Sequence, residues 1–310
     1  MLPIITVAVA LWLLTQTHET ALKGALVVWI ALAVIVAVRR LAVGLGAFTL
    51  VAVVALGAWI GANSSELTWF GHQVGHGPRD GRQVALTFDD GPDISATLAI
   101  ARILDQHGAK GTFFQVGKAV RARPDITKAL YDDGQLLGNH SYRHDSTHWL
   151  DPRYPELGMT QAVFADTVGA CPAFYRAPHG QHTPFVAHVV ADHHMVMAGW
   201  DVSVGDWTTQ SGASIARRVL AKVKPGSIID LHDGLDGNVH ADRTNLVAAM
   251  PLILDGLAAK GLQPVRLDVL LGKPAYLTGC GSRRPVQTRA AASGMAPKSI
   301  AASTRLVRDR

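Results

Sequence analysis

Cysteine is scarce in this chain of 310 residues, which contains only two, Cys171 and Cys280. So few cysteines exclude a small disulfide-rich scaffold, and their spacing excludes a zinc ribbon. In an oxidising compartment the two could pair with each other. Otherwise Cys171 is expected to be a small, buried, apolar side chain.

Charge is also limited, because Asp, Glu, Lys and Arg make up only 17% of the chain. The net charge of +5 is unevenly distributed: residues 276–310 carry seven basic residues and one acidic residue, whereas residues 71–275 are slightly acidic. This distribution argues against a nucleic-acid-binding domain. The tail, residues 273–310, is predicted to be basic and disordered. It either lies against anionic envelope polymers or lipid headgroups, or is solvated with no partner.

The first 62 residues contain few charges and form three apolar runs, over residues 1–17, 21–38 and 41–60. As helices, such runs can cross the roughly 30 Å hydrocarbon core of a membrane. No basic residues precede the first run, so an uncleaved helix is favoured over a cleaved signal peptide. The positive-inside rule places Arg39 and Arg40 in a cytoplasmic turn. The sequence therefore predicts a multi-pass protein of the cell membrane, with everything after residue 62 extracytoplasmic.

Residues 81–272, after a linker over residues 63–80, alternate between short β-rich runs and helical stretches. This alternation is typical of parallel strands joined by helices. Ser211 is predicted to begin one helix and Asp93 or Ser95 another, while Pro251 is expected to kink or split the last. Seven such units predict an α/β fold, a distorted (β/α)7-type barrel preceded by transmembrane helices. The predicted strands are 84–88, 112–116, 135–138, 173–176, 196–200, 227–231 and 264–267.

Most candidate catalytic residues follow directly after a predicted strand, which is where such folds place their sites. The first group is Asp89-Asp90-Gly91-Pro92, in which a strand leads into two adjacent carboxylates. Two adjacent acids can take different roles only if something cationic keeps both ionised. Taken alone, this group is more typical of an acidic turn that caps a helix.

The second group contains His140 and His144, which follow the third predicted strand. Histidines four residues apart lie on one face of a helical turn and can bind one metal ion, with an ionised aspartate as third ligand. His148 continues this spacing and is a spare candidate. Three more groups follow later strands: Arg176-Ala177-Pro178-His179, Trp200-Asp201 with Gly205-Asp206-Trp207, and Asp230-Leu231-His232-Asp233.

Together and in this order, the five groups resemble the motifs of the polysaccharide deacetylases, the NodB-homology domains of carbohydrate esterase family 4, over residues 84–267. The resemblance implies a distorted (β/α) barrel and a metal-dependent hydrolase that removes N-acetyl groups from amino sugars. It implies a divalent metal, zinc, with cobalt or nickel as alternatives. The implied roles are Asp89 as general base; Asp90, His140 and His144 as metal ligands; Arg176 holding Asp89; His232 as catalytic acid bordered by Asp206 and Trp207; and His179 and Leu231 at the substrate or oxyanion.

One residue departs from the pattern that the resemblance implies. Asp230 stands two residues before His232, where a leucine that lines the acetate pocket is usual. Either a strand slip turns Ile229 inward instead, or Asp230 faces His232 and raises the pKa of that histidine.

A membrane tether would place the domain beside the cell wall, so peptidoglycan is the expected substrate. Chitooligosaccharides, a lipid-linked amino sugar and O-acetylated xylan are the alternatives within the enzyme class. A catalytically inactive sugar-binding domain is the alternative from another class, and it should have lost the base, a ligand or the acid. All of these residues are present here. No nucleic-acid partner is expected, and the oligomeric state is not indicated.

Overall fold

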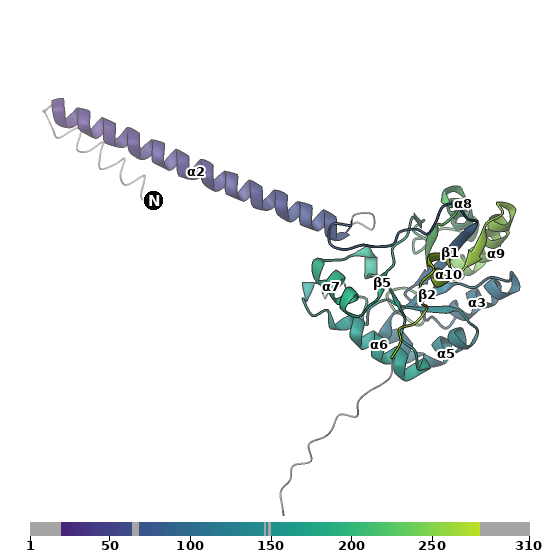
Figure 1. Ribbon diagram of the computed structural model, residues 1–310. Helices are drawn as coiled ribbons and strands as arrows, with labels where there is room; N and C mark the ends of the chain where they lie inside the picture. Colours follow the sequence, from purple (N-terminus) through teal and green to yellow (C-terminus); the bar gives the residue numbers. More distant parts are fainter. Residues whose placement is uncertain (1–19, 64–67, 146, 148–149, 280–310) are drawn as a thin grey trace, which may run out of the picture.

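The computed structural model describes residues 20–63, 68–145, 147 and 150–279 (Figure 1). A long helix leads into an α/β domain. The predicted helix over residues 1–17, His148, Cys280 and most of the predicted tail lie outside the described residues and stay predictions. The short described part of that tail packs on the domain: Tyr276 bridges Pro172, and the Leu277 N–H donates to the Cys171 carbonyl.

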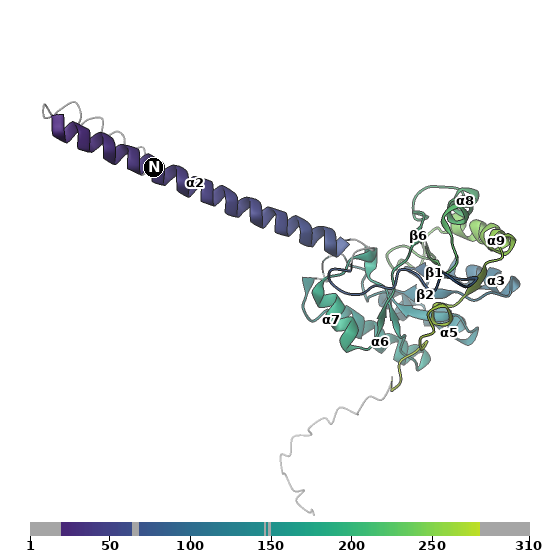
Figure 2. The same cartoon turned by 45° about the horizontal axis from the view of Figure 1, so that its top comes forward.

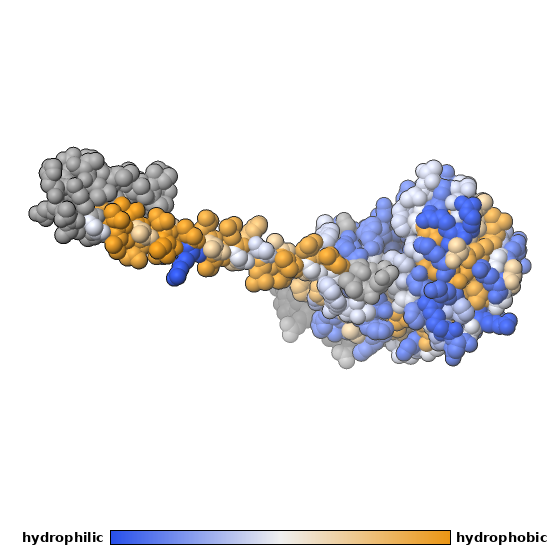
Figure 3. Space-filling model, turned by 90° about the horizontal axis from the view of Figure 1, so that it is seen from above, coloured by the Kyte–Doolittle hydropathy of each residue, from blue (hydrophilic) through white to orange (hydrophobic). Residues whose placement is uncertain are grey.

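Helix α2 (Thr20–Asn63) is one continuous helix of 44 residues, about 66 Å long at 1.5 Å per residue. The prediction of two helices separated by a turn at Arg39 and Arg40 is therefore wrong. Neither Gly nor Pro interrupts the chain there, and Val, Arg and Leu can all continue a helix. Its stretch Leu26–Asn63 is long and apolar enough to cross a membrane. Figure 3 shows this apolar surface beside the mixed surface of the domain.

The domain is built on one sheet of eight strands, in which every pairing is parallel. The order is β5-β4-β3-β2-β1-β7-β6, and β8 also pairs with the start of β1. All seven predicted strands are found, and only the short β6 was missed. The strands are β1 (Gln83–Asp89), β2 (Thr112–Gln115), β3 (Leu136–Asn139), β4 (Phe174–Tyr175), β5 (Val196–Met197), β6 (Val202–Ser203), β7 (Ile228–His232) and β8 (Gln263–Val265).

The sheet curls without closing into a full barrel. Among the described residues no strand ladder joins β5 to β6. Instead, the chain that enters the domain spans this gap, where Val74 bridges Ala198 and His76 bridges Ser227. The predicted parallel α/β architecture is confirmed, whereas the fold is a curled half-barrel, and part of the predicted linker belongs to it.

Helices cover the sheet (Figures 1 and 2). Ser211 caps α8 as predicted, since its hydroxyl accepts from the Ser214 N–H.

The helix after Asp93 begins later than expected, because the Asp93 carboxylate accepts from the Ser95 and Ala96 N–H groups and forms a turn. Helix α9 is not split at Pro251, since both its halves bury apolar side chains. The helices are α3 (Thr97–Gln106), α4 (Gly117–Ala122), α5 (Pro124–Asp132), α6 (Pro155–Val168), α7 (Pro184–Asp192), α8 (Gly212–Lys222), α9 (Thr244–Ala259), α10 (Leu267–Leu271) and the 3-10 turn η2 (Pro178–Gly180).

Candidate active site

Parallel pairing brings the ends of the central strands to one edge of the sheet. In the register of β1 and β7, Asp89 lies beside His232. Asp90 follows with φ 74°, a left-handed conformation that turns the chain directly after the strand. Both aspartates are 3% exposed. The strand ends thus bury two neighbouring carboxylates next to a histidine, as the sequence predicted.

Asp90, His140 and His144 meet at one point. The Oδ1 atom of Asp90 lies 2.9 Å from Nε2 of His144 and 3.3 Å from Nε2 of His140. Neither contact has hydrogen-bond geometry, and Asp90 Oδ1 has no hydrogen-bond partner among the described residues. The Nδ1 atom of His140 lies 2.9 Å from the Arg176 carbonyl oxygen, which fixes Nδ1 as the donor and leaves Nε2 as a free ligand atom. These three residues therefore fit a divalent metal ion.

The histidine pair is not carried by a helical turn, contrary to the prediction. Ser141 and His144 have left-handed backbone conformations, with φ 63° and 58°, so the segment is a loop. The Ser141 hydroxyl accepts from the His144 N–H at 3.1 Å and holds this loop closed. The spacing of four residues brings the two rings together, with centroids 5.0 Å apart, but through a different backbone path.

Arg176 holds Asp89 in place from the interior of the domain. It is fully buried, and its Nη1 atom donates to Asp89 Oδ1 at 2.8 Å and to the Thr87 hydroxyl at 2.7 Å. Its Nη2 atom donates to the Gly199 carbonyl at 2.9 Å. A guanidinium fixed by several partners is a rigid cation, so it can keep the adjacent Asp89 oriented.

His232 is held by two charged partners. Its Nδ1 atom lies 3.0 Å from Asp206 Oδ1, and its backbone N–H donates to Asp206 Oδ2. Arg243 in turn donates from Nη2 to Asp206 Oδ2 at 2.5 Å and from Nε to the His232 carbonyl at 2.8 Å. The indole of Trp207 packs edge-on against the His232 ring, with centroids 4.8 Å apart. Sequence reasoning missed Arg243, because no motif marks this single arginine ahead of α9.

The register of β7 resolves the position of Asp230. Asp230 pairs with Thr87 of β1 and is 2% exposed, and its Oδ1 lies 3.4 Å from Arg176 Nη1. Ile229 is buried in the apolar core, so no strand slip turns it inward. Leu231 also lies in that core and does not line the pocket, contrary to its predicted role. Side chains alternate along a strand, so Asp230 and His232 face the site while their neighbours face away.

The charges around the pocket shift several pKa values. Burial raises the pKa of Asp90, but His140 and His144 outweigh it and hold the value well below the usual range. Burial lowers the pKa of His232, yet the carboxylates of Asp230 and Asp206 overcome this and raise it to about 10. Burial raises the pKa of Asp230 to about 7. His232 is therefore protonated at neutral pH.

These residues surround one pocket of about 380 Å³. His179 lies exposed at its rim with φ 56°, and its ring packs edge-on against His144, with centroids 4.6 Å apart. Asp236, missed from the sequence, places Oδ1 2.9 Å from Nδ1 of His144. The lining residues are Asp89, Asp90, His140, His144, His179, Trp200, Trp207, Asp230, His232, Leu235 and Asp236.

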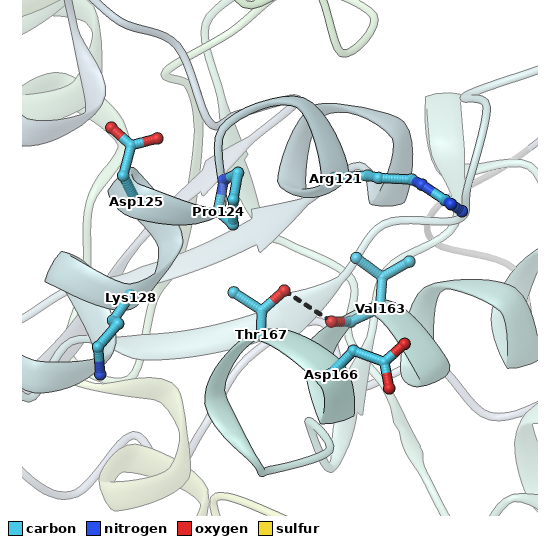
Figure 4. Close-up of a pocket in the computed structure, with 7 residues that line it drawn as sticks. All are labelled: Arg121, Pro124, Asp125, Lys128, Val163, Asp166 and Thr167. Carbon is cyan, nitrogen blue, oxygen red and sulfur yellow. Dashed lines mark hydrogen bonds between the residues drawn. The ribbon is translucent and has the colours of Figure 1, made fainter. Parts of the chain in front are cut away.

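A second cavity, of about 520 Å³, lies between α4, α5 and α6. Figure 4 shows that its charged side chains point in different directions and that the Thr167 hydroxyl bonds to the Val163 carbonyl. No residue of the predicted motifs lines it. We therefore place the candidate chemistry in the smaller pocket at the strand ends.

Comparison with known proteins yields consistent matches. A model of the polysaccharide deacetylase family matches residues 76–198, which include β1 to β5. The chain is 32% identical over 193 residues to a peptidoglycan-N-acetylglucosamine deacetylase of Bacillus cereus, covering 62% of this chain and 69% of that protein. It is 31% identical over 196 residues to a chitooligosaccharide deacetylase of Azorhizobium caulinodans, covering 59% and 92%. The crystal structure of a peptidoglycan N-acetylglucosamine deacetylase aligns with a TM-score of 0.61 at 29% identity, covering 65% of this chain and 93% of that one.

Proposed function

This chain belongs to the polysaccharide deacetylase family, and we propose that it removes N-acetyl groups from amino sugars of a cell-envelope polysaccharide, with peptidoglycan as the polymer concerned. The observation that carries the proposal is the pocket itself, which brings the carboxylate of Asp89 and the imidazole of His232 together with the three candidate metal ligands. The relatives named above act on the same kind of bond, the amide of an N-acetylated sugar.

Asp90, His140 and His144 would hold the divalent metal, zinc, with cobalt or nickel as alternatives. When bound, the metal would polarise the acetyl carbonyl and acidify a water molecule. Asp89 would take a proton from that water as its oxygen adds to the carbonyl carbon, while Arg176 keeps Asp89 oriented.

The carbon–nitrogen bond then breaks as His232 donates its proton to the departing nitrogen, which leaves acetate and a free amine. Asp206 would orient the His232 ring through Nδ1, so that Nε2 carries the transferred proton. The backbone N–H of His179 would stabilise the oxyanion. His179 lines the same pocket as the candidate metal ligands, which supports this role.

The direct test measures acetate release by the purified full-length protein from peptidoglycan fragments and chitooligosaccharides. Acetate should appear, should stop after treatment with a chelator, and should return when zinc, cobalt or nickel is added back. Absence of acetate with every glycan and every metal would rule out the deacetylase proposal and favour a sugar-binding role.

We further propose that α2 anchors the enzyme in the cell membrane with the catalytic domain outside the cytoplasm. The uncharged residues 41–60 of α2 match the roughly 30 Å core of a bilayer. Arg39 and Arg40 directly before them would then lie at the cytoplasmic face by the positive-inside rule. Because α2 is one continuous helix in place of the two predicted spans, it would cross the membrane once.

Replacing Arg243 with leucine is expected to lower kcat by roughly 10- to 100-fold while the metal content stays unchanged. Arg243 is 2% exposed and holds both Asp206 and the His232 carbonyl, so its loss frees the acid from its support. Steady-state kinetics and metal analysis of the variant check this. The exposed Arg153, 87% exposed in its side chain, provides the control, since Arg153→Leu should change neither quantity. Unchanged kcat in Arg243→Leu would contradict the positioning role.

Replacing Asp230 with asparagine is expected to move the alkaline limb of the kcat profile to lower pH by about 1 unit. His232 must be protonated to donate, and the Asp230 carboxylate, ionised above about pH 7, raises the pKa of His232. Removing this negative charge lowers that pKa, so activity is lost earlier as the pH rises. Asp255→Asn, a change at a carboxylate 74% exposed, should leave the profile in place. An unshifted limb in Asp230→Asn would show that Asp230 does not tune His232.

A further inference from the structure

The last turn of α2 is packed against the loop that carries His179. The His182 N–H donates to the Ala62 carbonyl at 2.8 Å, and Gln181 Nε2 donates to Asn63 Oδ1 at 2.7 Å. Ala62 is only 3% exposed, although most of α2 is bare. Figures 1 and 2 both show the end of α2 beside α7, which follows this loop. The helix end is thus docked on the domain at a defined place.

Aromatic side chains lie close to this docking point. Gly61 makes room for Trp69, because a Cβ atom at Gly61 would lie 2.7 Å from the Trp69 ring. A Cβ atom at Gly71 would lie 2.6 Å from the Cβ of Ala187, so the segment after Trp69 also packs against α7. Trp69 is nevertheless 61% exposed, and Phe185 at the start of α7 is 41% exposed. Exposed aromatic rings beside the end of an apolar helix are typical of the membrane interface.

The docking also fixes how far the pocket is from the membrane. If residues 41–60 span the hydrocarbon core, Ala62 lies about 3 Å beyond its edge. His182 is three positions after His179 at the pocket rim, which allows at most about 10 Å between their Cα atoms. With the contact between Ala62 and His182 included, the rim lies within about 20 Å of the hydrocarbon, close to the headgroups.

We propose that the pocket works at the membrane surface and that its substrate is an N-acetylated amino sugar still joined through a phosphate to a membrane lipid. This inference rests on the deacetylase function proposed above and specifies the form in which the envelope sugar is taken. A sugar on a lipid phosphate lies at the height of the docked rim. Trp69 and Phe185 enter the interface and hold the domain at that height.

The test compares two substrates for the full-length protein reconstituted in lipid vesicles. One is N-acetylglucosamine joined through a diphosphate to a polyprenyl chain in the same vesicles, and the other is soluble chitotetraose. A Gly/Ser spacer of about 20 residues inserted between Ser64 and Ser65 loosens the tether. Combined with Gly61→Leu, whose Cβ atom would lie 2.7 Å from the Trp69 ring, it keeps the anchor and removes the docking of the helix end. We expect kcat/KM for the lipid-linked substrate to fall at least about 10-fold and that for chitotetraose to stay within about twofold.

A double variant tests the same point without an insertion. Trp69→Ser with Phe185→Ser changes two exposed side chains and should raise KM for the lipid-linked substrate about 10-fold, with chitotetraose turnover unchanged. Leu252→Ser, at a residue 46% exposed on α9, is the matched control and should alter neither. Full activity of the spacer variant on both substrates would overturn the inference, and so would an equal loss on both. Failure of the wild-type protein on every substrate would instead refute the deacetylase function.

Discussion

Replacing His140 with alanine is expected to remove the bound metal and to lower acetate release at least about 1,000-fold. The Nε2 atom of His140 is one of three ligand atoms that converge in the pocket, and only two would remain. Polarisation by a metal is worth several kcal/mol of transition-state stabilisation. About 4 kcal/mol corresponds to that factor of 1,000. Asp89, the neighbouring carboxylate, stays bound to Arg176, so we expect no other ligand atom to take the place of the ring.

Metal analysis of the dialysed variant, together with its kcat on chitooligosaccharides, checks this prediction. His188→Ala is the matched control, because the His188 side chain is 72% exposed on α7 and lies outside the pocket. Thermal unfolding of both variants separates loss of metal from loss of fold. A His140→Ala protein that still binds one metal ion per chain would show that the three residues are not its ligands.

The central strands could be predicted because each contains an apolar run that the fold buries. Every residue of β2 and β3 is buried, and so is every residue of β1 except Gln83. Burial of successive residues is typical of parallel strands covered on both faces. The missed β6 has two residues and lies between Asp201 and Gly205-Asp206, so no apolar run marks it, unlike the equally short β4 and β5. Barrel closure depends on whether the edge strands β5 and β6 pair, and no local pattern encodes that pairing.

Within the candidate site, the sequence predicted which residues meet better than how they meet. Asp90, His140 and His144 converge as expected, but two left-handed residues replace the expected helical turn. The prediction that Leu231 lines the pocket could have been avoided. Successive side chains of a strand point to opposite faces, so a pocket that His232 faces cannot also be lined by Leu231. Arg243 could not be found in this way, because it comes from a separate loop and only the fold brings it to Asp206.

Replacing Asp89 with asparagine is expected to keep the metal bound and to lower kcat by about 100- to 10,000-fold, the usual contribution of a general base. Asparagine has the same shape and can still accept from Arg176 Nη1 through its amide oxygen. It cannot take a proton from water. Asp89 does not belong to the set formed by Asp90, His140 and His144, so the metal content should not fall.

The decisive comparison is between Asp89→Asn and His140→Ala, measured for metal content and kcat in parallel. The two side chains are neighbours, with Asp89 Oδ2 3.8 Å from His140 Nε2, so a nonspecific disturbance of the pocket would affect both quantities in both variants. Distinct roles require that only His140→Ala loses the metal. Asp192→Asn, at a carboxylate 61% exposed on α7, should behave as the wild type. If Asp89→Asn kept its full kcat, another group would have to be the general base. Asp230 is the other carboxylate beside Arg176, so Asp230→Asn would then be the variant that abolishes turnover.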